Sequence, residues 1–81
     1  MTNAQRLQGS FRQGLALPPA FDVTHADSSS LRQWDSVAHL ELVVAIEDNF
    51  GVRLTPADVI ELKSYQGAIA ILRRHGVWPD A

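Results

Sequence analysis

Hydrophobic residues recur along this chain at helical spacing, within segments that glycine, proline and serine separate from one another. In the first segment Leu7, Phe11 and Leu15 follow each other at every fourth position, as they do along one face of an α-helix. The pattern predicts a first helix over about residues 3–13. Gly14 is its expected end, because glycine accepts the left-handed conformation that often follows a helix.

Two further helices are marked by end signals as well as by apolar residues. A strongly periodic segment over about residues 36–49 runs into Gly51, which predicts a second helix with a left-handed glycine cap. Thr55 followed by Pro56 predicts the start of a short third helix, because a capping hydroxyl and then proline are typical of helix N-termini. Asp58 lies three residues after Thr55 and is expected to complete a capping box.

The last helix is expected over about residues 64–75 and is expected to end at Gly76. Its final turn carries three basic residues, Arg73, Arg74 and His75. Positive charge stabilises the negative end of a helix dipole, so we interpret these residues as dipole partners in preference to an anion site. Together the four segments predict an all-α fold, a four-helix bundle with a short third helix and a long first loop.

The first loop, from about residue 17 to 34, is longer than most connections. Its serine run at 28–30 follows Asp27 and is expected to form a solvated turn with a local Asp27 cap rather than a site. Trp34 at the end of the loop and Trp78 near the C-terminus are expected to cover the ends of so small a bundle.

The second predicted helix has two different faces when its residues are placed at 100° intervals. One arc is apolar and is the expected core face; it contains Leu42, Val43, Ile46 and Phe50. The other side mixes aliphatic residues with carboxylates; it contains Val37, Leu40, Glu41, Val44, Glu47 and Asp48. We interpret this outer face as a docking surface for a partner with an apolar depression surrounded by Arg or Lys. The alternative is that its aliphatic residues are ordinary exposed side chains.

Length and composition are those of one small globular domain. The chain has 81 residues, 46% of them hydrophobic, and we expect a single domain over 1–81 with an ordered core over about 3–76. No apolar run approaches the roughly 20 residues of a membrane span and the start lacks a signal pattern, so a soluble, cytoplasmic monomer is expected. The seven basic residues are scattered and the net charge is −2, which argues against nucleic-acid binding.

The segment from Trp34 to Gly51 is the most distinctive part of the chain, because it places Asp35 and Ser36 directly before a two-faced helix. Its sequence, WDSVAHLELVVAIEDNFG, resembles the attachment site of acyl carrier proteins, and the resemblance continues without a gap from Asp35 to Leu72. It implies a bundle of the acyl carrier type in which Ser36 bears a 4′-phosphopantetheine group. Independently of the family, Asp35 is expected to cap the helix, and the positive end of its dipole favours a phosphate on Ser36.

The resemblance also implies partners and chemistry. A phosphopantetheinyl transferase would attach the group from coenzyme A, and Asp35 would help to hold a magnesium ion during that transfer. The second helix would present the loaded arm to a loading ligase or transferase and to downstream pathway enzymes. Because the chain has no cysteine, the sulfur of any thioester must come from the cofactor. In this family a comparable loop packs apolar residues beneath the bundle; the candidates here are Phe21, Val23, Leu31 and Trp34.

His39 lies one turn after Ser36, at the edge of the core arc, and is expected to be packed and hydrogen-bonded rather than catalytic. The sequence has no paired histidine and carboxylate motif, no phosphate-cradling glycine loop and no cluster with metal-ligand spacing. These features predict a carrier and not an enzyme, with no catalytic residues and no metal site.

Three functions fit the sequence. The first is an acyl carrier of a dedicated biosynthetic pathway, because the mild net charge departs from the strongly acidic balance usual in carriers of bulk fatty acid synthesis. The second is an aminoacyl or peptidyl carrier, although those resemble a Gly-Gly-Asp/His-Ser pattern where this chain reads Gln33-Trp34-Asp35-Ser36. The third, of another class, is a helical interaction module that is never modified.

Overall fold

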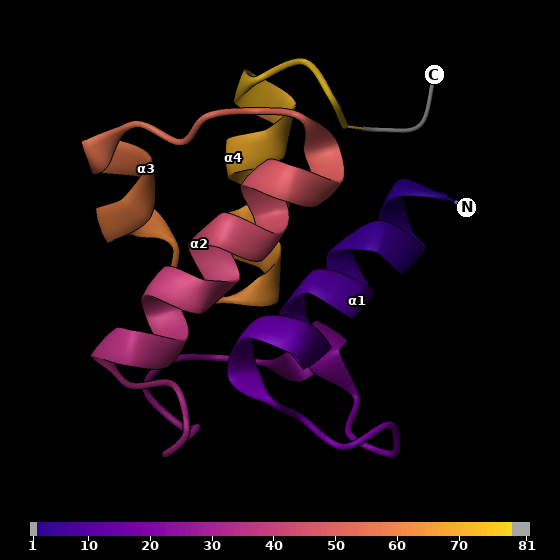
Figure 1. The fold of residues 1–81 in the computed structure, drawn as a ribbon, viewed down its shortest axis with the longest axis vertical. Coiled ribbons are helices and arrows are strands. Elements are labelled where there is room, and N and C mark those ends of the chain that lie inside the picture. Colours follow the sequence, from indigo (N-terminus) through magenta and orange to yellow (C-terminus); the bar gives the residue numbers. More distant parts are fainter. Residues whose placement is uncertain (1, 79–81) are drawn as a thin grey trace.

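The computed structural model describes residues 2–78, and the regular elements of this part are all helical. In chain order they are α1 (Asn3–Leu15), the short 3₁₀ helix η1 (Val23–His25), α2 (Ser36–Phe50), α3 (Pro56–Glu61) and α4 (Tyr65–Arg74) (Figure 1). The expected all-α bundle with a short third helix and a long first loop is therefore confirmed.

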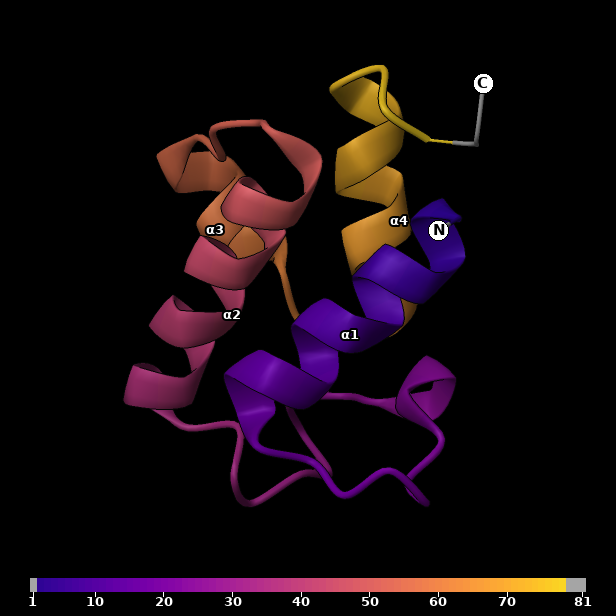
Figure 2. The same cartoon turned by 45° about the vertical axis from the view of Figure 1, so that its right-hand side comes forward.

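The helices α1 and α2 lie side by side and make the most extensive helix contact of the fold (Figures 1 and 2). The loop between them runs beneath the end of the bundle at which α1 finishes and α2 begins. Among residues 2–78, no helix combines the length and the hydrophobicity that crossing a membrane requires.

Gly14 lies inside α1 and does not end it, so that expectation from the sequence was wrong. The helix continues to Leu15, and Ala16 adopts the left-handed cap conformation with φ 52°. Gly14 is buried against α2, where a Cβ atom would lie 2.5 Å from the Cα atom of Leu42. The glycine therefore permits the close approach of α1 and α2.

We expect Gly14→Ala to destabilise the protein by about 2 kcal/mol, because overpacking against backbone outweighs the better helix propensity of alanine. Gly9→Ala is the matched control in the same helix, since its Cβ position is open. It should raise stability by up to about 1 kcal/mol. Urea unfolding measures both changes. Equal stability of the two variants would contradict the close helix contact.

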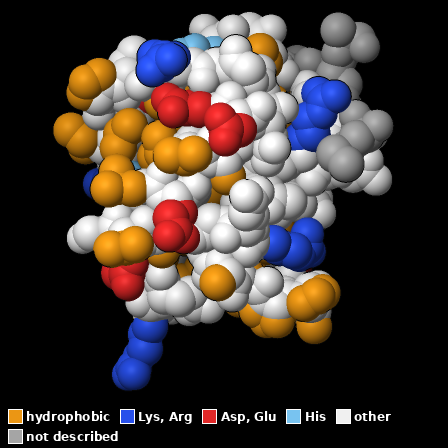
Figure 3. Space-filling view, viewed as in Figure 1, with side chains coloured by type: hydrophobic (Ala, Val, Ile, Leu, Met, Phe, Trp, Pro, Cys, Tyr) orange, Lys and Arg blue, Asp and Glu red, His pale blue; other side chains and the backbone are white. Residues whose placement is uncertain are grey.

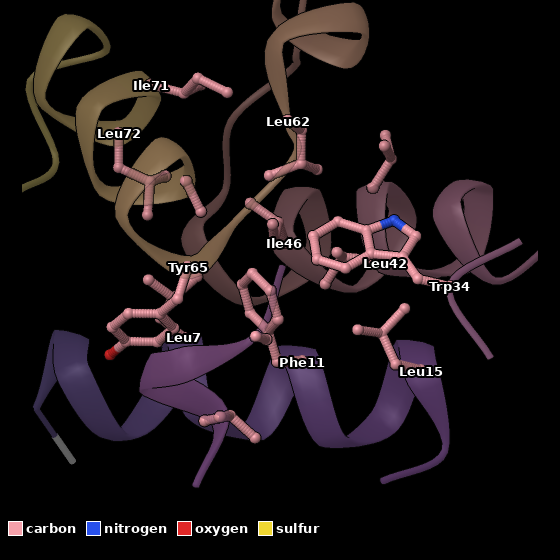
Figure 4. Packing of buried hydrophobic residues seen from close by; sticks show 14 of the residues in the cluster. Leu7, Phe11, Leu15, Trp34, Leu42, Ile46, Leu62, Tyr65, Ile71 and Leu72 are labelled. Atoms are coloured by element: carbon pink, nitrogen blue, oxygen red, sulfur yellow. The ribbon is translucent and has the colours of Figure 1, made fainter. Parts of the chain in front are cut away.

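Phe11 of α1 stands at the centre of the core, between two other aromatic rings (Figure 4). Its ring centroid lies 5.7 Å from that of Trp34, in an edge-on arrangement, and 5.4 Å from that of Tyr65. The first loop contributes to this core as expected: Val23 and Trp34 are buried, and two further loop residues, Phe21 and Leu31, are partly buried against them. Trp78 is also partly buried against the core.

The core face of α2 is confirmed for three of its four expected residues. Leu42, Val43 and Ile46 are buried, whereas Phe50 is only partly buried, so the expectation of a buried Phe50 was wrong. Phe50 is the last residue of α2, directly before the left-handed Gly51, and it therefore lies at the margin of the core. The aromatic contacts between elements are made by Phe11, which joins α1 to Tyr65 of α4 and to Trp34 of the first loop.

The capping box at the start of α3 is present and extends into a cluster with the end of α4. The Thr55 hydroxyl accepts from the Asp58 N–H, and the Asp58 carboxylate accepts from the Thr55 N–H, both at 3.0 Å. The buried Asp58 carboxylate also binds Arg74 at 2.7 Å and His75 at 2.8 Å, and Arg74 binds Glu61 at 2.6 Å. Arg74 and His75 are thus held by carboxylates, where the sequence indicated only the helix dipole.

These contacts fix the ionisation of the cluster. The hydrogen bond from His75, followed by that from the Thr55 N–H, lowers the pKa of Asp58 below its usual value. The Glu61 carboxylate raises the pKa of Arg74. Ionised Asp58 therefore stabilises the fold above its unfolded pKa, which is about 3.9, and this contribution is lost as the pH falls through the lower folded pKa.

We expect Asp58→Asn to lower stability at neutral pH by about 2 kcal/mol, since asparagine cannot accept from both basic partners. The difference from the natural protein should begin to shrink below about pH 4 and should disappear as the pH falls through the lower folded pKa of Asp58. Denaturant unfolding between pH 2.5 and 7 measures it, with the exposed Asp48→Asn as the control. A difference that persists undiminished at the lowest pH would show that Asp58 is not the titrating group.

Candidate functional site

Ser36 is the first residue of α2 and is exposed, although the chain just before it is firmly anchored. Trp34 is buried, and Asp35 adopts the extended backbone of a helix cap. The Asp35 Oδ1 atom accepts from the Ala38 N–H at 2.9 Å, which confirms the expected N-cap. Buried anchor, cap and exposed hydroxyl therefore follow each other directly.

The Ser36 hydroxyl is available for modification. Within residues 2–78 it makes no hydrogen bond to another group of the protein. The first N–H groups of a helix lack intrahelical acceptors, and together with the helix dipole they favour an anion at this end. The site therefore fits a phosphodiester on Ser36. In the described part of the chain, no group of three or more His, Cys, Asp or Glu side chains is placed to hold a metal ion.

Both ring nitrogens of His39 are hydrogen-bonded. The indole Nε1–H of Trp34 donates to Nδ1 at 2.9 Å, which makes Nδ1 an acceptor. The proton therefore resides on Nε2, which donates to the Val59 carbonyl at 2.7 Å. The ring also stacks on Trp34, with centroids 6.1 Å apart. The expectation of a packed, hydrogen-bonded histidine is confirmed, but the sequence did not indicate either partner.

A groove of about 590 Å³ begins at Ser36 and separates the N-terminal half of α2 from α3. On the side of α2 and the loop before it, the lining includes Trp34, Asp35, Ser36, His39 and Leu40. On the opposite side it is formed by Val59, Ile60, Leu62 and Lys63. The sequence analysis assigned no role to this second wall. The adjacent aliphatic pair Val59 and Ile60 was the feature of the sequence that could have indicated this wall. A short helix can bury only one of two such neighbours, so the other remains at the surface.

A second groove, of about 420 Å³, lies between α1 and the outer face of α2. Three aliphatic residues of α2 in this groove are exposed, Val37 by 67%, Leu40 by 60% and Val44 by 54%. Glu41 and Asp48 line the same groove, and Figure 3 shows carboxylates among hydrophobic side chains on this side of the molecule. The mixed surface expected from the sequence therefore exists. The sequence did not indicate that Gln13 and Gly14 of α1 complete the groove.

Glu47 differs from the other expected docking residues. It is half-buried, and its Oε2 atom accepts from the Leu54 N–H at 2.8 Å. Its carboxylate therefore holds the chain segment that follows α2 and does not stand free on the outer face. This corrects the placement of Glu47 beside Glu41 and Asp48.

The serine run forms the expected turn. The Asp27 carboxylate accepts from the N–H and the hydroxyl of Ser29, and these bonds lower the pKa of Asp27. Backbone hydrogen bonds then join this loop to the start of α4, from the Ser28 N–H to the Lys63 carbonyl at 2.8 Å and from the Tyr65 N–H to the Ala26 carbonyl at 3.1 Å. The turn is structural.

Comparison with known protein families agrees with this site. Residues 5–72 match the family described as "Phosphopantetheine attachment site", and the chain belongs to that family. No curated protein and no solved structure gives a significant match to the chain. Members of the family carry a covalently attached 4′-phosphopantetheine group, so the protein is a phosphopantetheine-bearing carrier with the helical fold of that class. Such domains are generally carriers and not enzymes, and they act with transferases and pathway enzymes.

Proposed function

We propose that this protein is an acyl carrier protein of a dedicated biosynthetic pathway, which bears its acyl group as a thioester on a 4′-phosphopantetheine arm attached to Ser36. The observation that carries the proposal is an exposed serine at the N-terminus of α2, one residue after a capping aspartate, whose hydroxyl makes no hydrogen bond within residues 2–78. The arm supplies the thiol, which the chain cannot supply because it contains no cysteine. As its partners we infer a phosphopantetheinyl transferase, an acyl-loading enzyme and the enzymes downstream of them, acting on a cytoplasmic monomer.

Other serines of the chain are poorer candidates for attachment. Ser10 is buried within α1, where its hydroxyl donates to the Arg6 carbonyl. The Ser29 hydroxyl is bonded to Asp27 in the loop, and the half-buried Ser64 caps α4. Each of these hydroxyls already serves the fold. Ser36 differs because its neighbour Asp35 caps the helix in its place.

We expect incubation of the apo protein with a transferase, magnesium and coenzyme A to add one phosphopantetheine group, measured by intact mass. Ser36→Ala should accept none and should fold normally, with stability changed by no more than about 1 kcal/mol. Peptide mapping of the natural protein locates the group. Attachment at another serine, or no attachment with several transferases, would contradict the proposal and leave the unmodified interaction module.

The nature of the cargo is tested on the holo protein. We expect acyl-loading enzymes to charge it and amino-acid-activating enzymes to leave it uncharged, again measured by intact mass. Charging with an amino acid in place of an acyl group would identify it as an aminoacyl or peptidyl carrier.

We also propose that the outer face of α2 is the surface that partner enzymes bind. Its exposed aliphatic residues line a groove whose rim carries Glu41 and Asp48. This pattern suits a partner with apolar side chains surrounded by Arg or Lys. Because α2 begins at Ser36, a partner on this face would lie beside the attached arm.

Replacing both Glu41 and Asp48 with lysine should slow acyl transfer to or from partner enzymes several-fold at low salt, and less at high salt, because ionic screening weakens charge attraction. Val44→Asp should slow the same steps with less salt dependence. Both variants should retain their circular dichroism, since exposed charges contribute little to stability. The control is Gln66→Lys, which adds a charge at an exposed position of α4. Unchanged rates for both variants with every physiological partner would remove α2 as the docking face.

A further inference from the structure

The groove of about 420 Å³ between α1 and the outer face of α2 continues into a smaller groove of about 270 Å³. Both grooves are lined by Gln13 of α1. On α2 the first groove extends from Val37 to Asp48, and the second is lined by the next residue, Asn49. The two grooves therefore form one continuous surface, which we call the α1–α2 seam.

The two ends of the seam carry opposite charge. Among residues 2–78, the groove nearer Ser36 is lined by two carboxylates, Glu41 and Asp48, and by no cation. The far groove is lined by Arg6 and by no carboxylate of the same part of the chain. Arg6 is exposed and donates to the neutral Asn3 side chain at 3.3 Å, and no carboxylate of residues 2–78 pairs with it. Opposite charges at the two ends favour one orientation of a bound partner.

The far end of the seam is held firmly by the fold. The Asn49 side-chain amide donates to the Ser10 hydroxyl at 2.7 Å, and the buried Ser10 hydroxyl donates to the Arg6 carbonyl at 2.8 Å. These bonds join α1 to α2. The groove stays open there because Gly9, one of its lining residues, has no side chain. The charges of the seam thus stand on two helices whose relative position is fixed.

We propose that the α1–α2 seam is the surface on which the phosphopantetheinyl transferase binds. Apolar and basic side chains of the transferase lie against the part that carries Glu41 and Asp48, and an acidic side chain of the transferase pairs with Arg6. This inference rests on the proposed modification of Ser36. The transferase is the partner because it must reach the Ser36 hydroxyl itself, and the seam begins at the next residue, Val37. Enzymes that act on the thiol meet it at the other end of the arm.

The sign of one charge change separates this seam from a docking surface on α2 alone. Arg6→Glu makes the protein more acidic, so a basic transferase that contacts only α2 should bind the variant equally well or better. A transferase with an acidic group opposite Arg6 should bind it less well. We expect Arg6→Glu to raise the KM for the apo protein several-fold at low salt, with kcat nearly unchanged, and to raise it less at high salt. Arg6→Lys retains the charge and should restore most of the natural KM.

The measurement is the initial rate of phosphopantetheine transfer from saturating coenzyme A, by intact mass, with the transferase that modifies the natural protein most efficiently. Arg73→Glu is the matched control, because it makes the same charge change at an exposed residue of α4 outside both grooves. Its KM should not rise, and circular dichroism should show that each variant is folded. An unchanged or lower KM for Arg6→Glu, or an equal rise for Arg73→Glu, would overturn this inference alone. No modification of Ser36 in the natural protein would overturn the proposed function as well.

Gly9→Leu tests the far end of the seam without changing its charge. A Cβ atom at this position meets no other atom within 4 Å, so the fold can accept a side chain that occupies the groove. We expect Gly9→Leu to raise the KM several-fold at low and high salt alike. Gln66→Leu adds the same side chain at an exposed position of α4 and should leave the KM unchanged. A natural KM for Gly9→Leu would show that the transferase does not cover α1 and would overturn the inference.

Discussion

The burial of Trp34 is the constraint on which the site depends. Its indole packs against Phe11 in the core, and only Asp35 separates it from Ser36. A buried anchor two residues before an exposed hydroxyl determines where the chain enters α2, so the loop before it can be long without making Ser36 mobile. The polar edge of the same indole orients His39. One side chain thus connects the core to both Ser36, the proposed attachment residue, and the groove beside it.

The close contact of α1 and α2 has a second consequence for the surface. Gly14 allows the α2 backbone to approach, which brings Leu42 and Ile46 fully into the core. The outer side of α2 is bordered by α1 but not covered by it, and Val44 remains exposed there. Gly14 also lines the groove between the two helices. The packing that buries one face of α2 therefore shapes the groove next to its other face.

Local patterns were sufficient to predict the helices and the N-terminal caps of α2 and α3. Leu7, Phe11 and Leu15 define a buried stripe, and Thr55 with Asp58 forms the capping box, because both signals lie within a few residues. The positions of Asp35 and Ser36 at the start of a helix were predicted in the same way.

Contacts between distant residues could not be predicted, because their partners have no fixed spacing in the sequence. The Val59 carbonyl is twenty residues from His39, and Arg74 is sixteen from Asp58. The role of Gly14 was predicted wrongly for the same reason. The residue it packs against, Leu42, is distant in the sequence, so the pattern indicated only a helix end. The helical angle of Glu47 placed it on the outer face of α2. The structure shows that the loop after α2 returns to it, so that the Leu54 N–H donates to its carboxylate.

The use of polar contacts around α3 follows from what its apolar residues must do. A six-residue helix has few apolar positions, and here Ile60 is turned to the groove and not to the core. Burying Ile60 would secure α3 more firmly, but it would remove an apolar wall from the groove beside Ser36. Hydrogen bonds instead hold α3 from two sides, through the Asp58 side chain to the end of α4 and through the Val59 carbonyl to His39 of α2. Such bonds require no apolar area. Because hydrogen bonds hold α3 in place, this short helix can remain ordered while the apolar side chain of Ile60 stays at the groove.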